Sequence, residues 1–73
     1  MRQYIATFHT HLAALMTCRN LNGKGVKAAM MPVPRKLSAS CGTCVRYQAE
    51  TAILDAMDPD VENVYEIVGK EEY

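Results

Sequence analysis

The chain has 73 residues, and its eight basic and eight acidic side chains give a formal net charge of zero. This length allows one domain with a modest core, which buries about 60% of the surface that the unfolded chain exposes. Zero net charge argues against a general attraction to nucleic acid or to an anionic membrane. No apolar run approaches the ~20 residues of a transmembrane helix and no signal-peptide pattern is seen, so we expect a cytoplasmic protein.

The first half of the chain predicts a strand, a helix and a second strand. Residues 2–8 alternate and are rich in aromatic and β-branched side chains, which is typical of a strand. Thr10 is a suitable N-cap for a helix over residues 10–23, whose apolar face carries Ala14, Cys18 and Leu21. Residues 26–31 follow as the second strand, which the prolines after it end.

The second half predicts a strand, a helix and a final strand. Residues 43–49 alternate, with Val45, Tyr47 and Ala49 directed towards the helices. Residues 50–57 predict a short second helix, closed by an Asp-Pro-Asp turn. Residues 61–68 alternate again as a strand, and residues 69–73 are polar and predicted to fray. We therefore expect a single domain over residues 1–73.

This order of elements predicts an α+β fold of the ferredoxin-like βαββαβ type, a four-stranded antiparallel sheet with both helices on one face. With right-handed crossovers, the expected spatial order is strand four, one, three, two. The first two strands then run the same way, so that the end of the first strand and the loop after the second lie at the same end of the sheet. His9, Thr10, the start of the first helix and Cys41 should gather there.

That loop, from Pro32 to Cys44, is the most distinctive stretch of the chain. It joins two prolines, two adjacent cations, two serines and the pair Cys41-Gly42. Gly42 has no side chain to shield the sulfur of Cys41, and nearby cations favour the reactive thiolate form of a cysteine. The cations close by in sequence are Arg35, Lys36 and Arg46. The alternative interpretation is an ordinary loop with an incidental cysteine.

The order Pro-x-Pro-Arg-x-x-Ser-x-Ser-Cys-Gly over residues 32–42 resembles the signature of a small bacterial family of selenium/sulfur carrier-like proteins. The opening Tyr4-Ile5-Ala6-Thr7-Phe8-His9-Thr10 and the pair Gly25-Val26 also match that family. The resemblance covers most of the chain, up to the expected second helix. It implies the same ferredoxin-like fold, and Cys41 occupies the position of the family's cysteine.

The resemblance implies a small cytoplasmic carrier that accepts sulfur or selenium on Cys41 as a persulfide-like adduct and passes it on, rather than a turnover enzyme. A thiolate attacks a persulfide sulfur, and the expected partner is a protein such as a cysteine desulfurase or a selenium-metabolism protein. No cofactor is expected. Other residues are expected to assist Cys41 by stabilising the thiolate, binding the carried atom, admitting the partner or donating a proton. These residues are Arg35, Lys36, Arg46, Ser38, Ser40, Gly42 and His9. The alternative is a protein-interaction or redox-regulatory module that uses the open sheet face.

Two further cysteines complete an odd set of three, which does not suggest a secreted disulfide framework, so reduced thiols are expected. Cys18 lies on the apolar helical stripe and is expected to be buried and inert. Cys44 completes a Cys-x-x-Cys spacing that is not part of the family signature. It either resolves a persulfide, which requires a turn at Gly42, or occupies a sheet position.

Two other classes of site are disfavoured. Cys41, Cys44, His9 and His11 supply four zinc-ligand types, but a His-x-His pair at a strand-to-helix boundary splays its rings apart, so no metal is expected. The aromatic-rich motif with which related sheets stack bases is absent, which disfavours nucleic acid. The sequence leaves open the oligomeric state and whether sulfur or selenium is carried.

Overall fold

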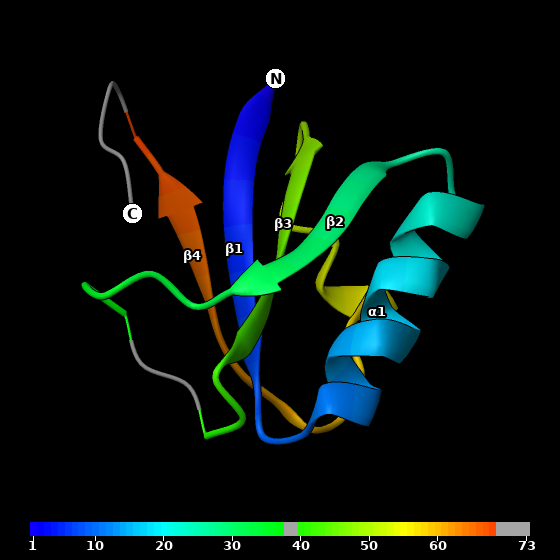
Figure 1. The fold of residues 1–73 in the computed structure, drawn as a ribbon. Coiled ribbons are helices and arrows are strands. Elements are labelled where there is room, and N and C mark those ends of the chain that lie inside the picture. Colours follow the sequence, from blue (N-terminus) through cyan, green and yellow to red (C-terminus); the bar gives the residue numbers. More distant parts are fainter. Residues whose placement is uncertain (38–39, 69–73) are drawn as a thin grey trace.

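The computed structural model describes residues 1–37 and 40–68, and within these ranges it has four strands, one α-helix and one short 3-10 helix. In chain order the elements are β1 (Arg2–Phe8), α1 (His11–Gly23), β2 (Lys27–Pro32), β3 (Thr43–Ala49), η1 (Leu54–Ala56) and β4 (Val61–Ile67). The strands form one antiparallel sheet in the order β2-β3-β1-β4, and α1 covers one of its faces (Figure 1). The α+β class, the antiparallel sheet and the strand order agree with the sequence prediction.

Helix α1 begins where the sequence predicts. Thr10 has an extended backbone, and its hydroxyl accepts a hydrogen bond from the backbone N–H of Ala13 at 3.1 Å. This N-cap satisfies one of the four N–H groups that the first turn leaves unpaired. The buried face of the helix consists mainly of small residues, which let it pack closely on the sheet: Ala13, Ala14, Thr17, Cys18 and Leu21.

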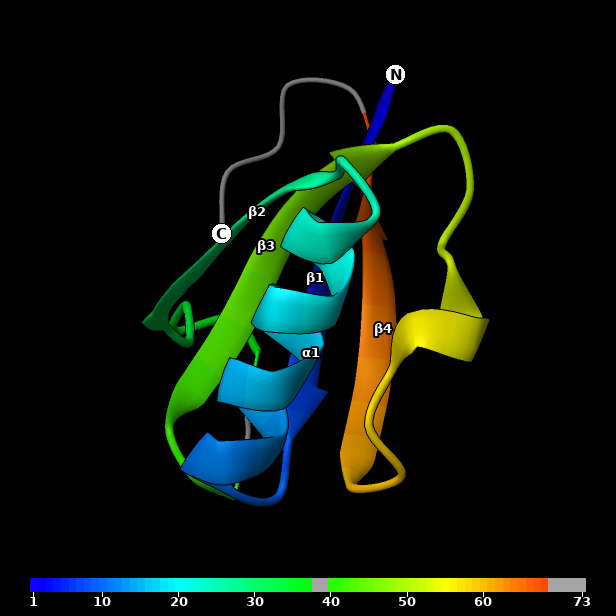
Figure 2. The same cartoon turned by 90° about the vertical axis from the view of Figure 1, so that its right-hand side faces the viewer.

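The predicted second helix over residues 50–57 is wrong, and with it the complete ferredoxin-like βαββαβ arrangement. In its place stands η1, a single 3-10 turn that packs beside α1 on the same face of the sheet (Figure 2). Ile53 has a left-handed backbone (φ 50°), which an α-helix does not allow, and the Tyr47 hydroxyl donates to the carbonyl of Ala52. The backbone N–H of Ala56 bonds the Ile53 carbonyl three residues back. A segment this short nucleates poorly as a helix, and these contacts supply other partners for its backbone.

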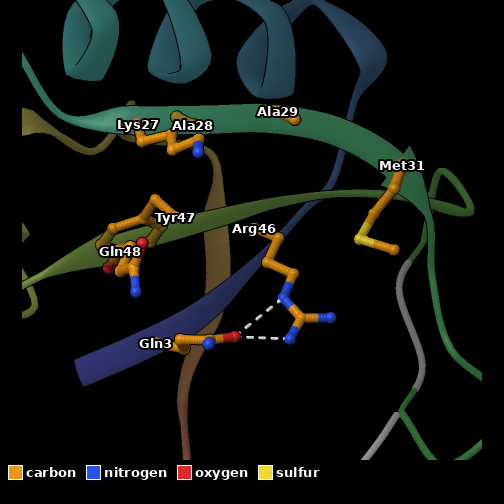
Figure 3. Close-up of a pocket in the computed structure, with 8 residues that line it drawn as sticks. All are labelled: Gln3, Lys27, Ala28, Ala29, Met31, Arg46, Tyr47 and Gln48. Carbon is orange, nitrogen blue, oxygen red and sulfur yellow. Dashed lines mark hydrogen bonds between the residues drawn. The ribbon is translucent and has the colours of Figure 1, made fainter. Parts of the chain in front are cut away.

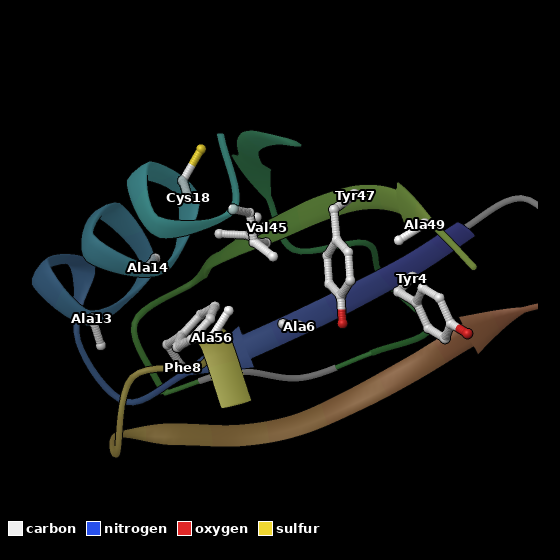
Figure 4. Packing of buried hydrophobic residues seen from close by; sticks show 11 residues of the cluster. Tyr4, Ala6, Phe8, Ala13, Ala14, Cys18, Val45, Tyr47, Ala49 and Ala56 are labelled. Atoms are coloured by element: carbon white, nitrogen blue, oxygen red, sulfur yellow. The ribbon is translucent and has the colours of Figure 1, made fainter. Parts of the chain in front are cut away.

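The main core lies between α1 and the sheet (Figure 4). Alternate residues of β1 and β3 point into it, among them Phe8, Val45 and Tyr47, each at most 1% exposed. The rings of Tyr4 and Tyr47 stack with their centroids 5.2 Å apart. Val45, Tyr47 and Ala49 thus face the helix as predicted, which fixes the direction of Cys44 and Arg46 to the opposite face.

The face of the sheet away from α1 is only partly open. Ile5, Thr7 and Cys44 point to this face and are nevertheless fully buried. The β2–β3 loop lies on this side of the sheet, and its Pro34 is buried (Figures 1 and 2). The loop therefore covers one end of the face that the sequence predicts to be open. Within the described residues, no helix is both long enough and apolar enough to span a membrane.

Candidate functional site

The β2–β3 loop is closed at its base by the sheet ladder. Pro32 pairs with Thr43, and the Val33 N–H donates to the carbonyl of Gly42 at 3.0 Å. A turn follows in which the Leu37 N–H donates to the Pro34 carbonyl at 3.0 Å. Gly42 has φ 73°, a left-handed backbone that glycine adopts without a steric penalty. These contacts place Cys41 directly before β3, at the end of the sheet where β1 finishes and α1 begins.

Cys41 is half-buried at the margin of the core. Its side chain packs against the core cluster, and its thiol lies 3.5 Å from the carbonyl of Thr43, to which it donates. Gly42 beside it is exposed, and a Cβ atom at this position would meet no atom within 4 Å. Among the described residues, the space beside Gly42, the next residue after Cys41, is therefore free of packing.

Both histidines contact residues that flank Cys41. His9, just after β1, places Nδ1 3.4 Å from the hydroxyl of Ser40. His11, in the first turn of α1, places Nδ1 2.9 Å from the hydroxyl of Thr43. The convergence expected from the strand order is thus present, and the positive end of the α1 dipole lies at the same end of the sheet as Cys41.

Glu62 on β4 also belongs to this site, although it is not among the residues expected from the sequence. Its Oε1 accepts a hydrogen bond of 2.7 Å from the Ser40 N–H, and its Oε2 lies 3.9 Å from His9 Nδ1. The sequence shows Glu62 only as one acidic residue of an acidic last third. The irregular register between β1 and β4 near Phe8 brings Glu62 beside the loop. No local sequence pattern predicts such a register shift. Thr43 was likewise not expected as a site residue, whereas the sequence does offer His11 beside His9.

Two of the three predicted cations lie in the β2–β3 loop, and the third lies in β3. Arg35 and Lys36 are exposed in the turn of the loop. Arg46 lies on the face away from α1, where its Nε and Nη2 both donate to Oε1 of Gln3 (Figure 3). In the part of the chain that the structure describes, no hydrogen bond joins Cys41 to any of them. Ser38, the other predicted serine, lies outside the described residues.

Cys44 occupies a sheet position and is fully buried. Its thiol lies 3.8 Å from the carbonyl of Pro32, to which it donates. Burial raises the pKa of Cys44, a negative charge on Cys41 raises it further, and Arg46 lowers it. Gly42 does supply a turn between the two cysteines, but the raised pKa keeps Cys44 in the thiol form at neutral pH.

Cys18 is buried on α1 as predicted, with its sulfur 3.6 Å from Nδ2 of Asn22. The three cysteines are all free, and Cys41 is the one that is not buried. Among residues 1–37 and 40–68, no group of three or more His, Cys, Asp or Glu side chains is arranged to hold a metal ion.

Comparison with known proteins identifies the family of the chain. No curated protein and no solved structure shows a significant match to the chain. A family model described as "Putative Se/S carrier protein-like" matches residues 3–69, a range that contains the described elements except the first residue of β1, and the whole loop around Cys41. The chain belongs to this family of selenium/sulfur carrier-like proteins.

Proposed function

We propose that the protein carries sulfur or selenium on Cys41 and transfers it between partner proteins. The observation that supports this most is that Cys41 alone among the three cysteines is not buried, next to an unobstructed glycine. Low shielding and a nearby helix N-terminus both favour attack by a cysteine thiolate. The family supports sulfur or selenium as the carried element, and the exposure of Cys41 supports it as the residue that carries the atom.

The loading reaction is a thiol exchange without net oxidation. The Cys41 thiolate attacks the terminal sulfur of a persulfide on a donor such as a cysteine desulfurase. A bond forms between Cys41 Sγ and that sulfur, the bond to the donor cysteine breaks, and the donor leaves as a thiolate that takes up a proton. An acceptor nucleophile then attacks the terminal atom of the Cys41 adduct and regenerates the Cys41 thiolate. Selenium follows the same sequence of bonds, and no bound cofactor is required.

Neighbouring residues have separate roles in this proposal. The Ser40 hydroxyl is available to the carried atom, and His9, 3.4 Å from that hydroxyl, can donate or accept a proton there. Gly42 admits the partner's loop. Arg35 and Lys36, exposed in the same loop, offer positive charge to an approaching partner, whereas Arg46 acts on Cys44. A reducing compartment such as the cytoplasm keeps all three thiols free.

The test is intact-mass spectrometry after incubation with a cysteine desulfurase and cysteine. The wild type should gain one sulfur atom, which a reducing thiol removes. Cys41→Ser should gain none, and Cys18→Ser is the matched control that should load normally. A Cys41→Ser variant that loads as well as the wild type would refute the proposal and favour an interaction module without carrier activity.

Cys44→Ser tests whether Cys44 resolves the adduct. If it does, the Cys44 thiolate attacks Sγ of Cys41, a Cys41–Cys44 disulfide forms and hydrogen sulfide leaves. Wild type would then accumulate a product lighter by two hydrogen atoms, and Cys44→Ser would accumulate the persulfide. Because Cys44 is buried and protonated at neutral pH, we expect both proteins to hold the persulfide equally.

A further inference from the structure

The face of the sheet away from α1 contains a hollow of about 520 Å³ beside the covered end (Figure 3). This volume lies in the range of small-molecule sites. Side chains of the central strand β3 and of its two neighbours line it on this face: Gln3, Lys27, Ala29, Met31, Arg46 and Gln48. Cys41 is not among the lining residues.

Charge in the hollow is of one sign. Lys27 and Arg46 contribute two cations, and none of the described lining residues is acidic. Ala29 of β2 lies directly opposite Arg46 of β3, and it is exposed and too short to fill the space. Among the described residues, no acidic side chain pairs with Arg46. A half-buried guanidinium in such a hollow attracts an anion more strongly than an exposed one, because less water screens it.

The hydrogen bonds of Arg46 leave two parallel donors free for an anion. Oε1 of Gln3 accepts from Nε and Nη2, so the amide holds one edge of the guanidinium in place. A guanidinium has five N–H donors, and two of the three that remain form the end-on pair on Nη1 and Nη2. In Figure 3 the unbonded nitrogen points away from Gln3, to the side of the hollow where Met31 lies. Two parallel donors at the end of a guanidinium match the two oxygens of a carboxylate.

We propose that this hollow binds a small carboxylate that has an apolar body and an amide group, in a site separate from Cys41. The carboxylate pairs with the free edge of Arg46, and Lys27 adds positive charge. Ala29 and Met31 contact the apolar body. The side-chain amides of Gln3 and Gln48 offer donors and acceptors to the amide group.

The experiment uses N-acetyl-leucine as the probe and N-acetyl-leucinamide as its neutral counterpart. The full chain is titrated with each, and backbone amide signals are followed by NMR. N-acetyl-leucine should give saturable shifts confined to β2, to residues 46–48 and to Gln3. N-acetyl-leucinamide should bind at least about tenfold more weakly. Equal binding of the two probes, or shifts centred on α1, would overturn the proposal.

Three variants test which residues bind the probe. Arg46→Lys keeps the charge but loses the paired donors, and should weaken N-acetyl-leucine about tenfold. Ala29→Glu places a carboxylate opposite Arg46 on an exposed edge-strand position, so it should fold normally and block the probe. Arg19→Gln removes an exposed cation of α1, outside the hollow, and should leave binding unchanged. Unaltered affinity in Arg46→Lys and Ala29→Glu together would refute the assignment.

Other occupants give different outcomes. Concentration-dependent dimerisation that Ala29→Glu abolishes would assign the hollow to a second copy of the chain. Binding that occurs only after Glu71 and Glu72, which lie outside the described residues, are changed to glutamine would assign it to the chain's own acidic segment. Either outcome overturns the proposal. Sulfur loading on Cys41 is measured separately by mass and does not depend on any of these results.

Discussion

The three cysteines occupy three environments, and their chemistry should differ accordingly. Cys18 packs on the buried face of α1, Cys44 points to the covered end of the opposite sheet face, and Cys41 is half-buried beside an exposed glycine. A cysteine reacts as its thiolate and only when a reagent can reach it. Environment, more than spacing in the sequence, therefore separates the three thiols.

Alkylation with iodoacetamide near neutral pH should modify Cys41 at least about tenfold faster than Cys44 or Cys18. Because burial raises the pKa of Cys44, its thiolate fraction is small at neutral pH and increases as the pH rises towards that raised pKa. Peptide mapping after timed quenching measures the three rates. Modification of Cys44 as fast as Cys41 at neutral pH would contradict the burial seen here.

Glu62 should hold the residue before Cys41 in place. Its carboxylate accepts the Ser40 N–H at 2.7 Å, a charge-assisted hydrogen bond across 22 residues of chain. Glu62→Ala should raise the hydrogen-exchange rate of the Ser40 amide about tenfold, because such bonds contribute about 1.5 to 3 kcal/mol.

Glu66→Ala is the matched control for Glu62→Ala. Glu66 lies on the same strand but pairs with Arg2, 3.9 Å away, at the other end of the sheet. Its removal should leave the exchange of Ser40 unchanged. Equal effects of the two substitutions would show a general weakening of β4 instead of a local contact.

At the scale of elements, α1 formed and the segment before β4 did not form an α-helix, although both have apolar helical spacing. Helix α1 has an N-cap and a face of five buried residues. Residues 50–57 form a shorter segment than α1. The Tyr47 hydroxyl donates a hydrogen bond to the Ala52 carbonyl, and Ile53 has a left-handed backbone. Tertiary partners overrode weak local propensity in the second case.

The N-cap of α1 should make a measurable contribution to the free energy of unfolding. Thr10→Ala removes the acceptor of the Ala13 N–H and should lower the free energy of unfolding by about 1 kcal/mol. Thr10→Ser keeps an oxygen in the same place and should cost much less. Urea denaturation followed by circular dichroism gives both values, and equal losses in the two variants would assign the effect to the lost methyl group.

At the scale of the whole molecule, a single tyrosine connects β3 with the segment that precedes β4. Tyr47 is 1% exposed, stacks on Tyr4 and donates to the Ala52 carbonyl. Burial, and to a smaller degree Tyr4, raise the pKa of Tyr47 to about 12 from its ordinary value of 10.0. The folded state therefore holds this proton more tightly than the unfolded state does.

The sign of the resulting pH dependence follows from linkage. Stability from Tyr47 is complete below pH 10 and is lost as the pH rises to about 12, because the unfolded chain ionises first. The loss should reach about 1.4 kcal/mol near pH 11. Urea denaturation at pH 8 and pH 11 measures it. At pH 8, Tyr47→Phe should have a free energy of unfolding about 1 kcal/mol lower than the wild type, because the hydrogen bond is missing. This variant should also lack the part of the alkaline loss that comes from Tyr47. Tyr65→Phe, the control, should keep that loss.

The sequence by itself determined the α+β class, the four strands and α1, and it singled out the loop that contains Cys41. These features follow from the period of apolar residues, the Thr10 cap and the prolines, which act over a few neighbouring residues. The strand order then predicted that His9 and α1 begin near Cys41, and contacts through Ser40 and Thr43 bear this out.

Only the tertiary structure decided the failure of the second helix, the burial of Cys44, the pairing of Arg46 with Gln3 and the place of Glu62. Each depends on residues far apart in the sequence: Tyr47 reaches Ala52 because β3 is anchored in the core, and Glu62 reaches Ser40 through an irregular register of β1 and β4. Sequence periodicity says which way a side chain points along its own strand. What covers that side chain is set by which loop folds over the strand, and this is a property of the packed molecule.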